Sequence, residues 1–474
     1  MSILSPALPE PTSAAREKAL RLLERSLGPS KVLTDPDACA GFGRDESEAE
    51  GAVPFAVVRA ESQSDISKAL AVAREAEVPI TPRAAGTGRT GGAVPRSGGI
   101  VLCTLGMNQI KEIDRREMIA VVEPGLVLGE LHAAVERDGL FYPPEPNSVE
   151  SCALGGNVAE NAGGPRAFKY GVTREYVLGV EAFLIGGQRI TPGRRTVKGV
   201  TGYDVTALLV GSEGTLAVFG DITLRLVPKP PSVMTLLALF SDVRAASVAV
   251  TAMTGAGLVP RCIELLDGHT LDAMRAAGNE FREQAGALLL IEVDGEPRET
   301  EEQAERVGNA CEGAIEVLVA QDAGQREKLW AARREMSRAV RKLTRFKLSE
   351  DVVVPRQQIP ELLDRVAKSC EGLGVRHLTY GHAGDGNLHV NFLWDQQEEA
   401  PAVERAIEQL FRDVVALRGT LSGEHGIGVL KAPYLHLEQS GELIELQRDI
   451  KRVFDPRGLL NPGKIFPGPG HRAC

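Results

Sequence analysis

Residues 79–95 read PITPRAAGTGRTGGAVP, and the segment 86–91 within them fits the spacing G-x-G-x-x-G. A nicotinamide dinucleotide fingerprint with this spacing requires its glycines to end a strand and to open a helix. A strand can precede the loop, but Pro95 and Gly98 after it exclude a helix of useful length. The segment therefore argues against an NAD site. Four glycines within residues 86–92 leave backbone N–H groups unhindered, so we expect an anion-binding loop.

Two further segments have the same character. Residues 151–171, SCALGGNVAENAGGPRAFKYG, contain five glycines and two asparagines, and GSEG (211–214) lies between two apolar runs. A single phosphate would need only one such loop. Three of them indicate an extended ligand that backbone groups hold along its length.

The composition is that of a soluble globular protein with two or three domains, since 43% of the 474 residues are hydrophobic and 25% are charged. A net charge of −10 argues against a nucleic-acid partner. No run approaches the roughly 18 apolar residues of a transmembrane span, and the N-terminus lacks the features of a secretory signal. The seven cysteines are scattered without a C-x-x-C pair, which suits a reducing cytoplasm and excludes a self-contained cysteine-ligated iron–sulfur cluster.

Short β-forming runs alternate with helical segments, which predicts an α+β fold. Apolar residues at helical spacing predict a helix over 14–27, closed by Gly28 and Pro29. The proline-marked break VPKPPS ends the part that holds the glycine loops. We therefore expect a first domain over residues 1–232, a second α+β domain over 233–420, and a C-terminal segment over 421–474 that returns to the first domain.

Histidines and a carboxylate gather in two motifs. In YGHAGDGNLHVNF, the glycines between His382 and His389 exclude a helix, so a tight turn can bring the two imidazoles side by side. The motif LSGEHGIG places Glu424 and His425 on a glycine-flanked loop. Two imidazoles and one carboxylate are the ligand set of a catalytic divalent metal, with zinc favoured and iron or manganese as alternatives. Isolated histidines, such as His132, are more often without a catalytic role.

A predicted helix over 326–343 places Arg333 and Ser337 four residues apart on one face. A guanidinium can clamp a carboxylate through two parallel hydrogen bonds. The alternative is a solvated, charge-laced face, which is our interpretation of Arg334, Arg338, Arg341 and Lys342.

Taken in order, PRAAGTGRTGGAVP, VEPG, PPEPNSVESCALGGNVAENAGG, YG, VTGYDVTALLVGSEGTLA and NPGK resemble the FAD-binding domain of the vanillyl-alcohol oxidase and p-cresol methylhydroxylase superfamily. More closely, the chain resembles the FAD-linked D-2-hydroxyacid dehydrogenases, which include D-lactate dehydrogenase, the flavin subunit of glycolate oxidase and D-2-hydroxyglutarate dehydrogenase. The resemblance covers nearly the whole chain. It implies a two-part FAD-binding domain, an α+β substrate or cap domain, and a C-terminal segment that completes both sites.

The resemblance also assigns residues. The FAD pyrophosphate would be wrapped by Arg83, Gly86, Thr87, Gly88, Thr90 and Gly91, with Pro82, Ala84 and Gly92 beside them. The ribityl and isoalloxazine parts would be lined by Ser151, Gly155, Gly156, Asn157, Asn161, Ala162, Gly163 and Gly164, with Pro144, Cys152, Ala159, Tyr170 and Gly171. The adenine half would lie near Glu213, Gly214 and Val218, and Asn461 would return to the flavin. Since the first glycine loop contains no histidine, we predict non-covalent FAD. Arg89 has no explanation beyond a phosphate contact.

In such enzymes His382, His389 and Glu424 would bind the metal, His425 would be the base, and Arg333, Ser337, Lys347 and Asn391 would bind the substrate. The expected reaction is oxidation of a D-2-hydroxy acid, with D-lactate first and glycolate or D-2-hydroxyglutarate behind it. Alternatives are a metal-dependent hydrolase and a non-redox ether-lipid-synthase-like enzyme. The electron acceptor would be an electron-transfer flavoprotein, a quinone-linked partner or an iron–sulfur partner subunit. We expect a cytoplasmic protein, with attachment to a membrane through a partner as an alternative, and a homodimer among the expected states.

Overall fold

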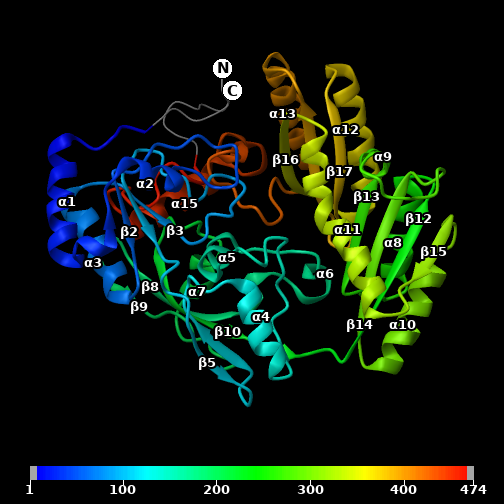
Figure 1. Cartoon of the computed structure of the whole chain (residues 1–474), viewed down its shortest axis with the longest axis horizontal. Coiled ribbons are helices and arrows are strands. Elements are labelled where there is room, and N and C mark those ends of the chain that lie inside the picture. Colours follow the sequence, from blue (N-terminus) through cyan, green and yellow to red (C-terminus); the bar gives the residue numbers. More distant parts are fainter. Residues whose placement is uncertain (1–7, 467–474) are drawn as a thin grey trace. The chain divides into compact units, whose positions relative to one another are not determined.

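The computed structural model describes residues 8–466, apart from the side chains at 331, 332, 334, 335, 337, 338 and 339. This part of the chain forms two compact units, each built from separate stretches of sequence. The first, which we call the N-terminal unit, comprises residues up to 162, 172–229 and 424 onward. The second, the central unit, comprises 163–171 and 230–423. Both units mix helices and strands, so the predicted α+β class is confirmed (Figure 1).

The N-terminal unit contains two larger sheets. A four-stranded sheet has the order β1-β2-β4-β3, with parallel pairing around β4, and an antiparallel five-stranded sheet has the order β5-β6-β10-β8-β9. The strands are β1 (Val32–Leu33), β2 (Ala56–Arg59), β3 (Ile80–Arg83), β4 (Ile100–Cys103), β5 (Ile110–Asp114), β6 (Ile119–Val122), β7 (Leu140–Phe141), β8 (Val177–Phe183), β9 (Arg189–Ile190), β10 (Val218–Arg225) and β11 (Val227–Pro228). The helices are α1 (Ser13–Leu27), α2 (Pro36–Ala40), α3 (Gln63–Ala76), α4 (Leu128–Arg137), α5 (Leu154–Glu160), α7 (Val205–Leu209), α14 (Leu435–Glu438) and α15 (Gly441–Phe454).

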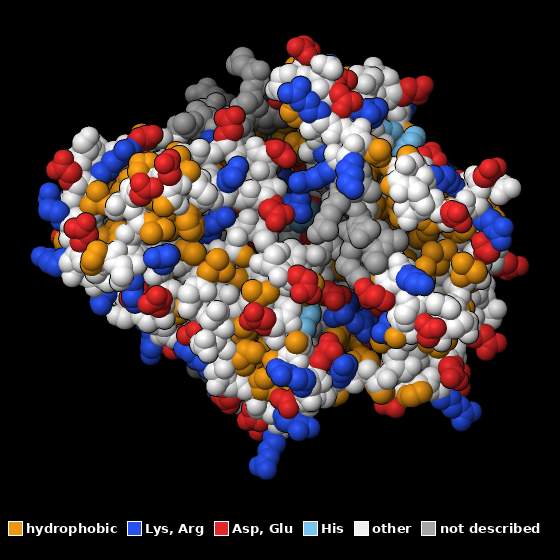
Figure 2. Space-filling view, viewed as in Figure 1, with side chains coloured by type: hydrophobic (Ala, Val, Ile, Leu, Met, Phe, Trp, Pro, Cys, Tyr) orange, Lys and Arg blue, Asp and Glu red, His pale blue; other side chains and the backbone are white. Residues whose placement is uncertain are grey.

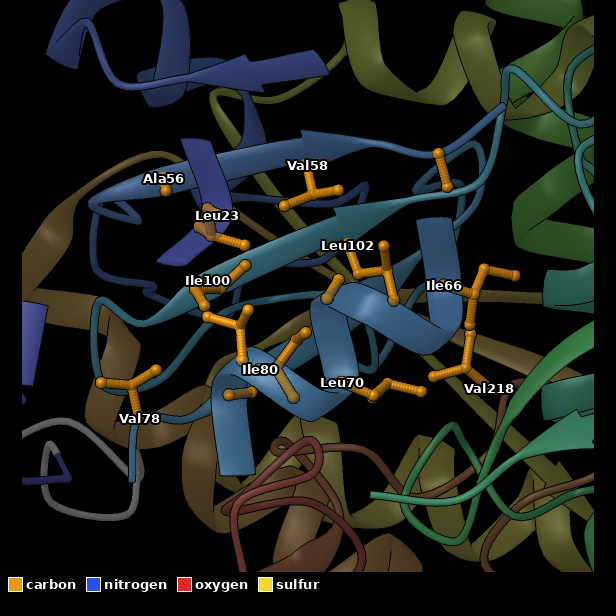
Figure 3. Close-up of a cluster of buried hydrophobic side chains, with 14 of the residues drawn as sticks. Leu23, Ala56, Val58, Ile66, Leu70, Val78, Ile80, Ile100, Leu102 and Val218 are labelled. Atoms are coloured by element: carbon orange, nitrogen blue, oxygen red, sulfur yellow. The ribbon is translucent and has the colours of Figure 1, made fainter. Parts of the chain in front are cut away.

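Helices α1 and α3 supply the apolar core beside the four-stranded sheet. Figure 3 shows Leu23 of α1 with Ile66 and Leu70 of α3 among strand residues such as Val58 and Leu102, and all five are fully buried. Burying a side chain of this size stabilises the fold by about 1.5–3 kcal/mol. Helix α1 begins after the cap residue Thr12 and ends at Leu27, before the cap residue Gly28, as its periodicity predicts.

The segment 79–95 has the local structure that the sequence predicts. Strand β3 ends at Arg83, and no helix follows in the described residues between Gly86 and the start of β4 at Ile100. Gly86 and Gly91 have φ angles of 73° and 86°, in the left-handed region that glycine tolerates. The loop is therefore a backbone turn that no helix N-terminus completes, and the NAD interpretation lacks its required context.

A seven-stranded antiparallel sheet organises the central unit, with the order β15-β12-β14-β13-β17-β18-β16. Its strands are β12 (Ser232–Phe240), β13 (Cys262–Asp267), β14 (Ala287–Gly295), β15 (Glu316–Val319), β16 (Phe346–Val353), β17 (Arg376–His382) and β18 (Asn387–Trp394). Its helices are α6 (Ala167–Tyr170), α8 (Val243–Gly255), α9 (Gly268–Ala276), α10 (Pro297–Ala310), α11 (Ala323–Lys342), α12 (Ile359–Leu373) and α13 (Ala400–Ala416).

Helices α9 and α11 cover one face of this sheet. Met336 and Val340 of α11 and Met274 of α9 pack against strand residues such as Leu266 and Leu378 in one buried cluster. Because a helix repeats every 3.6 residues, the same face of α11 that carries Met336 also carries Arg333. The apolar contacts thus turn a buried arginine toward the sheet.

The segment 163–171 belongs to the central unit, although the sequence analysis placed it within the first domain. Its helix α6 is anchored on Asp294 of β14, which accepts hydrogen bonds from Lys169 Nζ (2.5 Å) and the Tyr170 hydroxyl (2.8 Å). The Asp294 side chain is fully buried, so its charge requires such partners. This partnership joins residues more than 120 positions apart, which local patterns cannot reveal.

Charged side chains of both signs are interspersed over the face shown in Figure 2. The six cysteines between residues 8 and 466 are buried and unbridged, while Cys474 lies outside the described residues. None of the described helices is both long enough and apolar enough to cross a lipid bilayer.

Candidate active site

In the N-terminal unit, Asn461 connects the segments that the sequence analysis assigned to the cofactor. Its backbone N–H donates to the Ile80 carbonyl at 2.8 Å. Its side-chain amide donates to the carbonyls of Gly92 (3.0 Å) and Glu213 (2.7 Å). The Glu213 N–H in turn donates to the Ala159 carbonyl at 2.8 Å. The first and third glycine loops, the part of the second loop up to Ala162, and the C-terminal NPGK motif therefore meet in the N-terminal unit.

The loops approach so closely that glycine is required at their contacts. A methyl group at Gly214 would lie 2.6 Å from Cγ of Pro82. One at Gly428 would lie 2.2 Å from the Thr90 carbonyl oxygen. Both glycines also have positive φ angles, 66° and 53°. Substitution at either position would force the loops apart.

Buried polar atoms within this cluster point to a ligand. Among the described residues, Asn157 Nδ2, Asn461 Oδ1 and Ser212 Oγ are buried without a hydrogen-bond partner. Native structures rarely bury such atoms unsatisfied. Two of the three atoms belong to residues assigned to FAD, so the donors and acceptors present fit a polar, extended cofactor.

Two arginines of the first loop have protein partners. Arg83 Nη1 donates to the Arg44 carbonyl at 2.7 Å, and burial lowers the pKa of this guanidinium. Arg89, for which the sequence analysis had no explanation beyond a phosphate contact, forms an ion pair of 3.0 Å with Glu46. The Glu46 N–H also bonds the Gly88 carbonyl at 3.1 Å, so Arg89 and Glu46 brace the loop from outside.

The carboxyl groups of Glu213 and Glu160 are buried near each other, and Glu160 was not among the residues predicted from the sequence. Burial raises the pKa of Glu213, although its oxygens accept the N–H groups of Ile427 and Gly428, both at 2.7 Å, and these bonds act in the opposite direction. Burial, together with the charges of Glu213 and Asp45, raises the pKa of Glu160 well above its ordinary value. The pKa values of both carboxyl groups are therefore raised, and the shift at Glu160 is a large one.

The remaining cofactor assignments divide between the units. Pro144 accepts a contact of 3.1 Å from His132, and burial raises the pKa of the Cys152 thiol. Val218 is a buried member of the core cluster in Figure 3. The N-terminal unit contains these residues and the other assigned positions up to Ala162, whereas Gly163, Gly164, Tyr170 and Gly171 are in the central unit.

In the central unit, strands β17 and β18 bring His382 and His389 together, as the motif predicts. Antiparallel pairing sets Tyr380 opposite His389 and His382 opposite Asn387, which places both histidines on one face. The imidazole centroids are 5.4 Å apart with planes at 88°, and both side chains are buried. This pairing supplies two of the three predicted metal ligands.

Carboxylates on flanking strands face the second nitrogen of each ring. Glu264 of β13 contacts His382 Nδ1, and Asp351 of β16 lies 3.9 Å from His389 Nδ1. An imidazole whose Nδ1–H faces a carboxylate presents its Nε2 lone pair to a metal, an arrangement common around bound zinc. Burial tends to raise the pKa of Glu264, but His382 and Arg333 outweigh it, and the net pKa is lowered. The donor set fits a divalent metal.

Tyr380 is the centre of the predicted substrate residues. The Arg333 guanidinium lies over its ring at 5.0 Å, Lys347 Nζ is 3.4 Å from its hydroxyl, and that hydroxyl is 3.5 Å from Asn391 Oδ1. The structure thus brings together the groups expected to bind a carboxylate. The side chain of Ser337 lies outside the described residues. Tyr380 opens the motif YGHAGDGNLHVNF, which is the signal that could have identified it.

The loop of Glu424 and His425 is held at both ends. Before it, the Gly423 N–H donates to Asp351 Oδ2 at 2.9 Å within the central unit. After it, in the N-terminal unit, the Thr90 hydroxyl donates to the His425 carbonyl at 2.9 Å. His425 Nε2 and Glu424 Oε1 are 3.9 Å apart, so the imidazole and the carboxylate of this loop lie close to each other.

Two family models match the chain. A family model for the FAD binding domain matches residues 54–192, and the model for the C-terminal domain of FAD linked oxidases matches residues 229–465. The chain belongs to the FAD-linked oxidase family. The predicted family and the predicted FAD cofactor are thereby confirmed, and the protein is an FAD-dependent oxidoreductase.

Curated relatives within the FAD-linked oxidase family span the expected group. Glycolate oxidase subunit GlcD of Bacillus subtilis is 40% identical over 419 residues, covering 87% of this chain and 89% of the relative. D-lactate dehydrogenase of Anaerostipes hadrus is 33% identical, with 93% and 96% covered. D-2-hydroxyglutarate dehydrogenase of Stutzerimonas stutzeri is 30% identical, with 94% and 98% covered. The solved structure of p-cresol methylhydroxylase shares the fold, with a TM-score of 0.83 at 16% identity over 97% of this chain and 98% of that one.

Proposed function

We propose that this FAD-linked oxidase converts a D-2-hydroxy acid, with D-lactate as first choice, to the 2-keto acid. A divalent metal, with zinc favoured, assists the reaction, and the FAD is bound non-covalently. Glycolate and D-2-hydroxyglutarate are the alternative substrates, because the three types of relative fall within a narrow range of identity.

One observation carries the proposal. A single sheet face of the central unit gathers two buried imidazoles, each facing a carboxylate, with a guanidinium, an ammonium and an amide around Tyr380. Two kinds of chemistry therefore lie side by side: imidazole nitrogens that can bind a metal and cationic groups that can bind a carboxylate. A 2-hydroxy acid presents a hydroxyl and a carboxylate on adjacent carbons, which matches both.

The residues would divide the work as follows. Arg333 and Lys347 would bind the substrate carboxylate and fix the direction of the hydrogen on carbon 2. His382, His389 and Glu424 would hold the metal, which when bound lowers the pKa of the substrate hydroxyl. His425 would accept the hydroxyl proton at its imidazole, and such general-base help is worth about 10²–10⁴-fold in rate. The bound FAD would supply the acceptor for the hydride from carbon 2.

Electrons would then leave through an outside acceptor: an electron-transfer flavoprotein, a quinone-linked partner or an iron–sulfur partner subunit. The scattered cysteines of the chain offer no cluster site of their own. We expect slow turnover with oxygen and fast turnover with a dye acceptor. Efficient formation of hydrogen peroxide would contradict this part of the proposal.

The decisive experiment is a panel of D- and L-2-hydroxy acids with a dye acceptor, run with and without a chelator. We expect turnover of D-lactate, little with L-lactate, and loss of activity on chelation that added zinc restores while the flavin spectrum is unchanged. Anaerobic bleaching of the flavin by D-lactate would exclude the hydrolase and ether-lipid-synthase alternatives. Absence of bleaching by every D-2-hydroxy acid would overturn the proposal.

A further inference from the structure

Glu264 occupies an unusual position in the central sheet. Strand β13 pairs antiparallel with β17, and the register sets Glu264 directly opposite His382. Directly paired residues point to the same face, so its carboxylate enters the face that carries the histidines. The side chain is fully buried among strands and helix α11, where a carboxylate is costly unless it is paired.

Each oxygen of this carboxylate has a different partner. Oε1 contacts Nδ1 of His382, a predicted metal ligand. Oε2 accepts a hydrogen bond of 2.8 Å from Nε of Arg333 and lies 2.6 Å from its Nη2. One buried group therefore joins the ring that would bind the metal to the guanidinium that would bind the substrate carboxylate.

The two contacts fix the orientation of the His382 ring and of the Arg333 guanidinium. The contact at Nδ1 favours the His382 tautomer with the proton on that nitrogen, which directs Nε2 toward a metal. The contact at Nε fixes the plane of the Arg333 guanidinium over the Tyr380 ring, 5.0 Å from its centroid. Neither His382 nor Arg333 can turn without breaking a bond to the same carboxylate.

We propose that Glu264 is a positioning residue that couples metal binding to substrate binding in this enzyme. The inference rests on the proposed function. Its distinctive consequence is that one substitution, at a residue that would itself touch neither the metal nor the substrate, weakens both the metal affinity and the recognition of the substrate carboxylate.

The sheet offers a matched control. Glu292 of β14 lies one strand away, is also buried, and is also bonded to helix α11, through Trp330 Nε1 at 2.6 Å. It further accepts a bond of 2.7 Å from Thr235 and does not contact the histidines in the bonds observed here. Glu292→Gln therefore removes a similar buried charge without touching the metal site.

The test compares wild type, Glu264→Gln and Glu292→Gln by zinc affinity, measured through competition with a chromogenic chelator, and by KM and kcat for D-lactate. We expect Glu264→Gln to lower zinc affinity about 10–100-fold and to raise KM at least about tenfold, with FAD content unchanged. Glu292→Gln should remain within about twofold of wild type in both. Glu264→Asp keeps the charge on a shorter arm, so it should give intermediate losses and serves if the glutamine variant does not fold.

The outcomes separate the two proposals. If wild type binds zinc and oxidises D-lactate while both Glu264 variants match Glu292→Gln, the coupling role is wrong and the proposed function stands. If loss of zinc affinity occurs without any change in KM, Glu264 serves the metal alone and the coupling is again wrong. If wild type neither binds zinc nor oxidises any D-2-hydroxy acid, the proposed function fails and the coupling fails with it.

Discussion

The hydroxyl of Thr90 donates a hydrogen bond of 2.9 Å to the backbone carbonyl of His425, 335 positions further along the chain. Thr90 belongs to the first glycine loop, and His425 is the predicted base. The carbonyl of Thr90 also accepts the N–H of Val429 at 2.8 Å. The first glycine loop and the segment that carries the predicted base are thus fixed to each other through Thr90.

Replacing Thr90 with valine keeps the shape of the side chain but removes this bond. We expect a loss of about 1 kcal/mol in stability, which is a fall of about 2–4 °C in Tm, and a several-fold loss in kcat because His425 is less well fixed. Thr215→Val is the control, since its hydroxyl bonds the nearby Ser212 carbonyl at 2.8 Å. It should lower Tm similarly and leave kcat unchanged; equal losses of kcat in both variants would refute the link.

Replacing His425 with alanine should leave FAD bound and slow the anaerobic bleaching of the flavin by about 10²–10⁴-fold, because no other group is expected to take the substrate proton. Stopped-flow absorbance measures both the flavin content and the bleaching rate. His436→Ala is the control, since that exposed ring only contacts the Pro433 carbonyl at 2.8 Å in the bonds observed here. Bleaching at the wild-type rate would remove His425 from the role of base.

Replacing Arg333 with lysine retains the charge but loses the fork that bonds Glu264. We expect KM for D-lactate to rise about 10–100-fold, since bidentate recognition of the carboxylate is lost. Steady-state kinetics with a dye acceptor would measure it. Arg341→Lys, at an exposed position of the same helix, should have no effect.

The carboxyl pair predicts a pH dependence of stability. Burial, Glu213 and Asp45 raise the pKa of Glu160 above 4.5, so the folded protein holds this proton more tightly than the unfolded chain does. The stabilisation is complete below the unfolded pKa and is lost as the pH rises through the raised pKa. Glu160→Gln should flatten this part of the Tm profile and raise Tm by at least about 3 °C at pH 8.

The neighbouring substitution should act in the opposite direction. Glu213→Gln weakens the charge-assisted bonds from Ile427 and Gly428, each of which is worth about 1.5–3 kcal/mol. Thermal unfolding between pH 5 and 8 compares the two variants. A lower Tm for Glu160→Gln at pH 8 would show that Glu160 is ionised in the native protein.

Local sequence patterns were sufficient to predict helices and turns, but not which distant residues contact one another in the fold. Periodicity predicts α1, and the glycines of the histidine motif predict the β17–β18 turn that pairs His382 with His389. The sequence could not identify Glu264 as a partner of His382. That contact exists because β13 lies beside β17, and the two residues are 118 positions apart. No local pattern encodes strand order at that separation.

Contacts between charged side chains that are distant in sequence could not be predicted either. The raised pKa of Glu160 arises from burial and from the charges of Glu213 and Asp45, which are distant in sequence. Arg89 was unexplained until Glu46 was found beside it. Side-chain partners across loops depend on the tertiary fold, so they could be assigned only from the structure.

The anchoring of α6 on Asp294 limits how this enzyme can be recombined with its relatives. A chimaera that exchanges residues 230–423 alone would separate Asp294 from Lys169 and Tyr170, leaving Arg261 as its observed ionic partner at 3.2 Å. Removing partners of a buried charge costs about 3–5 kcal/mol. A functional exchange of substrate specificity should therefore transplant residues 163–171 together with the central stretch, as two inserts from the same parent.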